Sequence, residues 1–490
     1  MTRPTPGDPG ARERALARCR ERGVVIPTLA EMRDPGRVDP AIREALSGVD
    51  MQAVDPLNLF RITWRNDPAT GGFGEVNALE LPPELTGVPA RIVGLVGQHF
   101  PTGAHKVGAA FGCLVPRLVS GAFDPTRQRA VWPSTGNYCR GGAFDSALLG
   151  CRAVAILPEE MSRERFEWLE GIGAEIIATP GSESNVKEIF DACAEIRRTR
   201  PEDVIFNQFE EFGNYLWHYG VTGPAAESAF DRLARRGDRL AAWVGATGSA
   251  GTLAAGDYLK SRVSGVRITA AEALQCPTLL MTGFGAHRIE GIGDKHVPWI
   301  HNVRNTDLVT AIDDEATLRL LRLFNEDAGR EELARRGVPD DTIARLPLLG
   351  ISSICNLLAA VKTARYYELD GRDVLLTSLT DSVELYRTRL AEMEAERGAY
   401  DGRAATGDAE RFLAGATTDH LRELRHTDRR ALHNLKYFTW VEQQGKTAEE
   451  LDALWSPAFW SDLAGTLPAL DESIEAFNRE SGALDAPTGA

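Results

Sequence analysis

Between residues 97 and 270 the chain alternates short apolar runs with longer stretches that have helical spacing. The apolar runs predict strands, and the stretches between them predict helices of about ten residues or more. This alternation indicates βαβ units and a parallel sheet that is buried on both faces. The predicted strands are Ala130–Trp132, Ala153–Leu157, Glu175–Ala178, Val204–Phe206 and Ala241–Val244. The predicted helices are a segment ending at Leu149, Ser162–Gly171, Asn185–Arg198, Gly220–Arg232 and Ser249–Lys260.

The pattern continues on both sides of this region. Two runs before it and three after it predict further strands: Leu57–Thr63, Arg91–Val96, Val266–Glu272, Leu308–Ala311 and Val374–Leu379. Helices are expected over Glu315–Asn325 and from Gly350 to Tyr366, and the charged segment Arg330–Leu346 predicts an inserted helical piece.

The two ends of the chain differ from the middle. Residues 1–50 are rich in Pro and Arg and predict an extension that wraps the surface. Ala404–Asp408, with glycines on either side, is typical of a linker. Glu410–Ser481 has a helical pattern with aromatic anchors. This tail can be a cap or an oligomer contact, or it can pack as ordinary helices within the monomer.

Composition narrows the classes of partner. The 490 residues carry a net charge of −15, which argues against nucleic acid or an anionic membrane as a general partner. A local basic pocket for one phosphate stays compatible with that balance. The seven cysteines are scattered without a CxxC pair, and no HExxH occurs, so we expect neither disulfides nor a metal. No apolar leader or long apolar span is present, so we expect a cytoplasmic protein.

Lys106 lies at the predicted junction between the strand Arg91–Val96 and a small-residue helix. The stretch reads GQHFPTGAHKVG (residues 97–108), and the following helix has the three-and-four apolar spacing of a buried stripe. A lysine desolvated at such a junction has a lowered pKa and can act as an amine nucleophile. At an arbitrary position, a lysine whose side chain extends to solvent is more common than a buried functional amine. Whether Lys106 is functional therefore depends on which other loops lie near it.

Two more loops of this kind follow predicted strands. Gly245–Thr252 reads GATGSAGT, and its small residues would let backbone N–H groups and a helix N-terminus hold an anion. Ser134–Asn137 reads STGN and offers hydroxyls, an amide and N–H groups to a carboxylate, although an ordinary helix cap has the same composition. In a parallel sheet, such loops meet outside the carboxyl ends of the strands. A poised lysine, a phosphate cup and a carboxylate nest are together what pyridoxal phosphate and an amino acid require.

At these motifs the chain resembles the fold-type-II pyridoxal-phosphate enzymes, above all the cysteine synthase and cystathionine β-synthase branch of the tryptophan synthase β-like superfamily. PTGAHK is similar to the tryptophan synthase β-chain lysine motif, and STGN to the cysteine synthase substrate loop. The segments LPEEMSRERFEWLEGIGAEIIATPG, GATGSAGT, GIGDKHVP and GISS follow in the family's order. The resemblance covers roughly residues 55–390. It implies an α/β fold with two open, mostly parallel sheets flanked by helices, plus N-terminal and helical C-terminal extensions.

The resemblance also implies roles for individual residues. Lys106 would be the catalytic residue and form the imine with the cofactor, and His105 would contact its phosphate side. Asn137 would reach both the ring hydroxyl and the substrate carboxylate. The remaining cofactor contacts would be Gly245, Ala246, Thr247, Gly248, Ser249, Thr252, Ser352 and Asp381, and the remaining substrate contacts Ser134, Thr135, Gly136 and Gln208.

Three departures from the family pattern bear on the reaction. Asp381 stands in the stretch TDSVELY, where the family has PSxGERY, so either Ser352 or Asp381 can face the pyridine nitrogen. A serine there would leave the nitrogen neutral, whereas an aspartate would keep it protonated. Ile354 and Tyr138 replace smaller family residues, which puts the usual substrate range in question.

The resemblance implies β-replacement or β-elimination on a serine- or cysteine-like amino acid through an aminoacrylate. An ammonia-lyase or a diamino-acid synthase of specialised metabolism is the alternative, and a non-catalytic binding relative is a third possibility. We expect a small-molecule amino-acid substrate and a homodimer. The expected divisions are an N-terminal extension (1–54), a catalytic core (55–395) with a smaller mobile subdomain at about 97–220, and a helical C-terminal extension (396–490).

Overall fold

A computed structural model describes residues 7–134, 136–181, 186–293 and 295–483. Its larger sheet has seven strands in the order β1-β2-β10-β7-β8-β9-β11, all parallel except the two edge strands β1 and β11. These strands are β1 Ala78–Leu81, β2 Arg91–Val96, β7 Arg239–Ala246, β8 Arg267–Ala273, β9 Leu308–Ile312, β10 Asp373–Leu379 and β11 Leu421–Glu423. Every residue of β2, β9 and β10 is buried, because helices cover both faces of the sheet.

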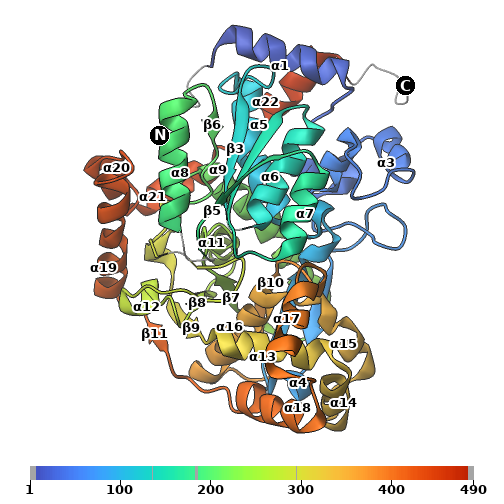
Figure 1. Ribbon diagram of the computed structural model, residues 1–490, viewed down its shortest axis with the longest axis vertical. Helices are drawn as coiled ribbons and strands as arrows, with labels where there is room; N and C mark the ends of the chain where they lie inside the picture. The colour runs from blue at the N-terminus through green and yellow to red at the C-terminus, as the bar shows by residue number, and fades with distance from the viewer. Residues whose placement is uncertain (1–6, 135, 182–185, 294, 484–490) are drawn as a thin grey trace.

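The second sheet is parallel throughout and has the order β5-β4-β3-β6. Its strands are β3 Arg129–Pro133, β4 Arg152–Pro158, β5 Glu175–Thr179 and β6 Val204–Ile205. Figure 1 shows this sheet with its helices in the upper half of the molecule and the larger sheet below it. The two open, mostly parallel sheets expected from the sequence are therefore confirmed.

Helices surround both sheets. Those between β2 and β7 in the chain are α5 Lys106–Ser120, α6 Asn137–Leu148, α7 Arg163–Gly171, α8 Val186–Thr199, α9 Phe212–Trp217 and α10 Gly223–Leu233. Those between β7 and the tail are α11 Leu253–Arg262, α12 Thr278–Met281, α13 Asp314–Asn325, α14 Asp327–Arg335, α15 Asp340–Arg345, α16 Ile351–Tyr366 and α17 Arg387–Arg397. The charged insertion is helical as predicted, since α14 and α15 occupy it.

The first and the last helix that the structure describes, α1 and α22, lie against each other. The N-terminal helices are α1 Pro9–Glu21, α2 Leu29–Arg33, α3 Pro40–Leu46 and α4 Pro83–Thr86, and the tail contains α18 Gly402–Asp408, α19 His426–Lys436, α20 Ala448–Ala453, α21 Pro457–Ala464 and α22 Leu467–Ser481. Arg12 of α1 forms an ion pair with Glu480 of α22, and the Arg20 side chain donates a hydrogen bond to the Ser481 carbonyl (2.6 Å). Figure 1 shows α1 and α22 together at one end of the molecule.

The tail also packs on the body of its own chain. The buried Nζ of Lys436 donates to the carbonyls of Trp299 (2.9 Å) and His301 (2.7 Å), and Trp440 Nε1 donates to the Val297 carbonyl (2.9 Å). This is packing within one monomer, the second of the two arrangements considered for the tail. Among the described residues, no helix has the length and apolar character needed to cross a bilayer.

Three local predictions are wrong. The expected strand Leu57–Thr63 is a 3₁₀ helix, Pro56–Arg61, because Pro56 cannot donate to a strand ladder and the Asp55 side chain caps the turn. The expected linker Ala404–Asp408 belongs to α18, whose first turn is capped by Asp401. The helical tail also contains the strand β11, which pairs antiparallel with β9.

Candidate active site

Lys106 begins α5, directly after two short turns that follow β2. Its Nζ lies 3.0 Å from Ser249 Oγ and 3.3 Å from Gln208 Oε1. Burial lowers the pKa of this amine from 10.5 to about 8. A substantial fraction of Lys106 is therefore uncharged near neutral pH, which is the condition for nucleophilic attack by an amine.

A cavity lies next to the amine. It is lined by residues that follow the carboxyl ends of β2, β7 and β10, where ligands of open α/β sheets bind. The lining residues are His105, Lys106, Ala246, Gly248, Ser249, Ala250, Gly251, Thr252, Gly291, Ile292, Asn356, Ser378 and Thr380. Among them, Asn356 and Ser378 were missed by the sequence reasoning, since neither belongs to a glycine-rich or capping motif.

The loop between β7 and α11 forms a cup on one side of the cavity. Within the described chain, the backbone N–H groups of Gly248, Ser249 and Ala250 make no hydrogen bond, so they are free to bind an anion. Ala250 has a φ of 62°, an unusual conformation for a residue with a side chain and one that clusters at functional sites.

The cup does not include every residue predicted for it. Thr252 lines the cavity, but the Thr247 hydroxyl donates to the Ala271 carbonyl (3.0 Å). Thr247 instead lines a second cavity, which Gly248 also borders. Gly245 lies deeper in the strand end and does not line the first cavity either.

His105 lines the cavity beside Lys106 and is completely buried. Its ring lies 5.3 Å from the rings of Trp64 and His218, and neither ring nitrogen has a hydrogen-bond partner in the part of the chain that is described. Burial lowers the pKa of His105 to about 3, so the imidazole is neutral and adds no positive charge beside the amine.

The predicted substrate loop reaches Lys106 through Gln208. Gln208 Nε2 donates to Ser134 Oγ (3.3 Å), while its Oε1 accepts from Lys106. Thr135 lies outside the described residues. Gly136 has a φ of 152°, and a Cβ at this position would lie 2.5 Å from Arg165 Nε, so only glycine fits here.

Asn137 and Asp381 are brought together across the two halves of the molecule. Asn137 Nδ2 donates to Asp381 Oδ2 (2.6 Å), which also accepts from the Tyr386 hydroxyl (2.7 Å). Burial raises the pKa of Asp381, and the positive charge of Arg165, 4.0 Å away, opposes this change. The Ser352 hydroxyl, at the start of α16, is buried without a hydrogen-bond partner among the described residues.

An ion-pair cluster that sequence reasoning missed joins these loops. Arg165 of α7 contacts Glu290 and donates to the Tyr386 hydroxyl (3.1 Å), and Arg389 Nε donates to Glu290 Oε1 (2.6 Å). Arg165 and Tyr386 are 221 residues apart in the chain. No local pattern signals a pairing over that separation, although both residues lie in segments that resemble the family.

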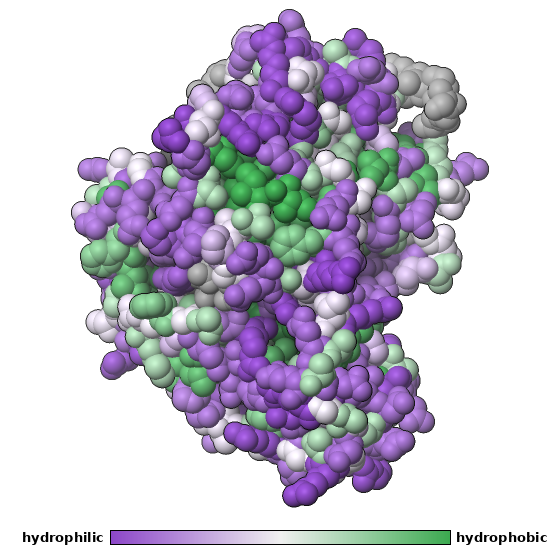
Figure 2. Space-filling model, in the orientation of Figure 1, coloured by the Kyte–Doolittle hydropathy of each residue, from purple (hydrophilic) through white to green (hydrophobic). Residues whose placement is uncertain are grey.

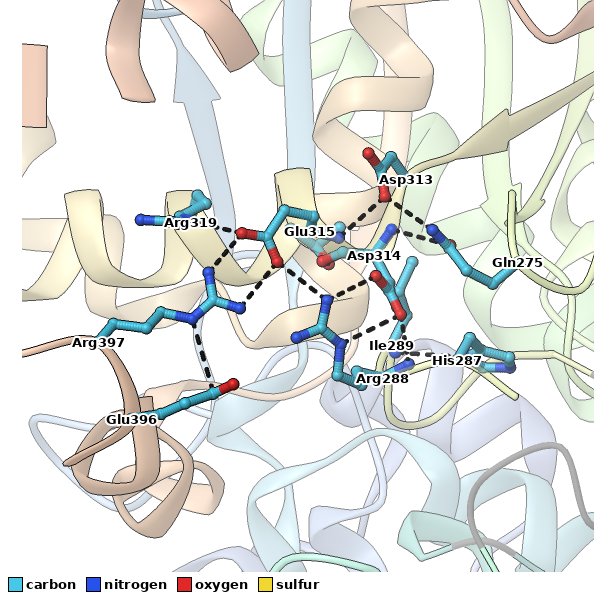
Figure 3. A network of polar contacts seen from close by, with 11 residues as sticks. Gln275, His287, Arg288, Ile289, Asp313, Asp314, Glu315, Arg319, Glu396 and Arg397 are labelled. Atoms are coloured by element: carbon cyan, nitrogen blue, oxygen red, sulfur yellow. Dashed lines mark hydrogen bonds and ion pairs between the residues drawn. The ribbon is translucent and has the colours of Figure 1, made fainter. Parts of the chain in front are cut away.

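A second network holds the base of the loop that supplies Gly291 and Ile292 to the cavity (Figure 3). Arg288 bridges Asp314 (2.9 Å) and Glu315 (2.9 Å), and Arg397 contacts Glu315 from α17. The surrounding guanidinium groups lower the pKa of Glu315, led by the hydrogen bond from Arg397. This loop is thus anchored to α13 and α17 by charge pairs.

These features fit pyridoxal phosphate. The Lys106 amine, with its lowered pKa, can join the aldehyde of this cofactor. Among the described residues, the N–H groups at Gly248–Ala250 and the Ser352 hydroxyl have no hydrogen-bond partner, so they are available to its phosphate and its ring.

Comparison with known proteins agrees with this fit. The family model "Pyridoxal-phosphate dependent enzyme" matches residues 95–330. The chain is 30% identical to cysteine synthase B of Campylobacter jejuni over 287 residues, 58% of this chain and 86% of that protein. It is 27% identical to cystathionine beta-synthase of Saccharomyces cerevisiae over 326 residues, 65% of this chain but only 61% of the yeast protein.

The fold agrees as well. A crystal structure of cysteine synthase from Entamoeba histolytica aligns with a TM-score of 0.55 and 20% identity, over 76% of this chain and 96% of that one. The chain therefore belongs to the family of pyridoxal-phosphate-dependent enzymes, as its motifs suggested. It is similar to cysteine synthases and cystathionine beta-synthases within that family.

Proposed function

We propose that this pyridoxal-phosphate-dependent enzyme catalyses β-replacement on an amino acid that carries a leaving group at Cβ, as on serine or an O-acylated serine. The observation that carries the proposal is the Lys106 amine, with its lowered pKa, beside a cavity that the anion cup also lines. The names of the relatives, cysteine synthase and cystathionine beta-synthase, support the same class of reaction.

Lys106 has two tasks in this scheme. Lys106 would hold the cofactor through its aldehyde, and as a free amine it would remove the Cα proton of the substrate. When bound, pyridoxal phosphate supplies the electron sink for the bond that is broken at Cα. The contacts to Ser249 and Gln208 hold the amine at the cavity wall, where the proton must be collected.

The substrate carboxylate is assigned to the loop 134–137 and to Gln208. Ser134 and Gln208 already form one hydrogen-bonded unit with Lys106, so a carboxylate bound there is fixed relative to the base. Asn137 donates to Asp381 in this structure, and its amide would have to be shared with the substrate or the ring hydroxyl.

We assign the ring nitrogen to Ser352. Its hydroxyl is buried and makes no hydrogen bond among the described residues. Asp381 Oδ1 is likewise without a partner there, but the carboxylate is already held through Oδ2 by Asn137 and Tyr386. A hydroxyl leaves the nitrogen neutral, which favours loss of a β-substituent over deeper carbanion stabilisation. Asp381 then orients Asn137.

The test is incubation of the holoenzyme with O-acetyl-L-serine, with and without a thiol. A thioether amino acid that forms only with the thiol supports replacement. Formation of pyruvate and ammonia at an unchanged rate in both reactions would overturn it in favour of an ammonia-lyase.

A homodimer and a cytoplasmic location belong to the same proposal, and sedimentation velocity of the purified chain tests the first.

A further inference from the structure

Arg140, in the first turn of α6, is a buried arginine with guanidinium donors that no described residue accepts. It is 3% exposed, and neither Nε nor Nη1 has a hydrogen-bond partner in the described chain. Its guanidinium carbon lies 4.7 Å from the centre of the Trp168 ring, which covers one face. Arginines are rarely buried without a pairing partner, because the charge loses its hydration.

The neighbouring carboxylates are taken by other arginines. Glu290 is shared between Arg165 and Arg389, and Asp381 lies 4.0 Å from Arg165. Arg389 also pairs with Glu392. Among the described residues, none of these carboxylates accepts a hydrogen bond from Nε or Nη1 of Arg140, so these two donors remain available.

The position of Arg140 separates it from the phosphate cup. It follows Asn137 by three residues, so the two share a face of α6. A Cβ on the next residue, Gly141, would lie 3.0 Å from the carbonyl carbon of Lys106. Arg140 is thus beside the substrate loop, while the cup lies on the loop between β7 and α11. The phosphate of the cofactor is already provided for elsewhere.

We propose that Arg140 binds a second oxyanion on the substrate amino acid, a carboxylate or a phosphate at its side chain, and so selects acidic substrates. The proposal rests on the proposed function, because it takes residues 134–137 as the substrate loop. The guanidinium edge presents parallel N–H donors that match an oxyanion, and the Trp168 ring fixes its plane. An anionic side chain supplies the acceptors that the protein does not.

The experiment compares three amino acids on the wild-type holoenzyme and on Arg140→Met, which keeps the length but not the charge. O-phospho-L-serine carries a phosphate, L-aspartate a carboxylate, and O-acetyl-L-serine no side-chain charge. Half-saturation is read from the cofactor absorbance, and turnover from product. Arg163→Met is the matched control, because Arg163 is an exposed arginine of α7.

The wild type is expected to bind at least one of the anionic amino acids tenfold or more tighter than O-acetyl-L-serine. Arg140→Met should abolish that preference and change the neutral substrate less than threefold, and Arg163→Met should change neither. Whether O-phospho-L-serine or L-aspartate loses its preference in Arg140→Met shows whether Arg140 recognises a phosphate or a carboxylate. Arg140→Lys, which keeps a charge, should retain part of the preference.

Two results would overturn the proposal: no anionic preference in the wild type, or an equal loss for all three amino acids in Arg140→Met. If Arg140→Met does not fold, the proposal is tested by the relative affinities of the three amino acids for the wild type and for Arg140→Lys. The proposed function fails separately. β-Replacement is ruled out if no β-substituted amino acid yields product. In that case, an absorbance change with L-aspartate that depends on Arg140 would still support the anion contact at Arg140.

Discussion

At the scale of single residues, Lys106 shows how position determines chemistry. Its sequence neighbours predicted a desolvated amine at a strand-to-helix junction, and the structure gives the amine a pKa of about 8. The contacts behind it, Ser249 and Gln208, come from two distant loops, and only the fold brings them together.

Lys106→Ala should leave the protein without covalently held cofactor and lower its turnover by at least about a thousandfold, as expected when a nucleophile is removed. The measurement is borohydride reduction followed by mass spectrometry of the peptide that spans residue 106. Lys187→Ala, which changes an exposed lysine of α8, is the control and should retain the pyridoxyl mass. A pyridoxyl adduct on another lysine of the unaltered protein would contradict the assignment.

The lowered pKa of Lys106 has a direct kinetic consequence. Only the neutral amine attacks an aldehyde, so cofactor attachment to apoenzyme is fast above the folded pKa and slow below it. The attachment rate should therefore rise with pH and level off around pH 8, rather than continue to rise toward 10.5. Stopped-flow absorbance across pH 6.5–10 measures the midpoint. A midpoint above pH 10 would show that the amine is solvated.

Ser352 and Asp381 make a second comparison between single residues. Ser352→Ala should change the pH titration of the cofactor absorbance, because it removes the hydroxyl that we assign to the ring nitrogen. Asp381→Asn should mainly weaken substrate binding through Asn137, about tenfold for the loss of one charge-assisted hydrogen bond. The reverse pattern, with the spectrum altered only by Asp381→Asn, would assign the nitrogen to the carboxylate.

At the scale of elements, the loop between β7 and α11 was predicted as an anion cup, but its threonines have different tasks. Thr252→Ala should loosen cofactor binding several-fold with little effect on stability, since Thr252 lines the cavity. Thr247→Ala should lower the free energy of unfolding by about 1 kcal/mol, because it removes a buried hydrogen bond to Ala271. Cofactor titration and thermal unfolding of both variants measure the two effects. Equal cofactor loss in the two variants would contradict this division.

Secondary-structure elements and the loops between them could be predicted from the sequence, whereas contacts between distant elements could not. Alternating strands and helices, the order of the motifs and the loops at strand ends are local patterns, and they located the cavity wall from Lys106 to Thr252. The pairing of Arg165 with Tyr386 is not local, because it depends on how two sheets pack. The segment at residues 57–63 failed for another reason: its apolar pattern suits a strand, but Pro56 and the Asp55 cap favour a turn.

At the scale of the whole molecule, the tail is held by a buried lysine. Lys436 is fully buried, donates to two carbonyls, and has a pKa well below 10.5 because of desolvation. The unfolded chain binds that proton more readily, so the contribution of Lys436 to stability rises with pH up to about 10.5. The unfolding free energy of wild type minus that of Lys436→Met should increase by up to about 1.4 kcal/mol per pH unit in this window. Denaturant melts at pH 7.5 and 9.5 check this, and a difference that falls with pH would contradict it.

Most of the surface in Figure 2 is hydrophilic, with smaller apolar areas between. Among the described residues, the large apolar side chains that remain exposed are Val54, Met281, Phe284, Tyr366, Tyr437 and Phe438. Two of these, Tyr437 and Phe438, directly follow α19, so the tail both packs on the core and presents apolar surface outward.

The pairing of β11 with β9 has a consequence for how this protein can be shortened. Residues 421–423 close one margin of the larger sheet, whose neighbouring strand is buried along its whole length. A polypeptide that ends before residue 421 would leave the amide and carbonyl groups on the β11-facing side of that strand without partners, next to apolar side chains. An exposed edge strand of this kind can pair with the same strand of another copy. A protein shortened to the size of its smaller relatives is therefore expected to aggregate, even though all of the proposed site residues would still be present.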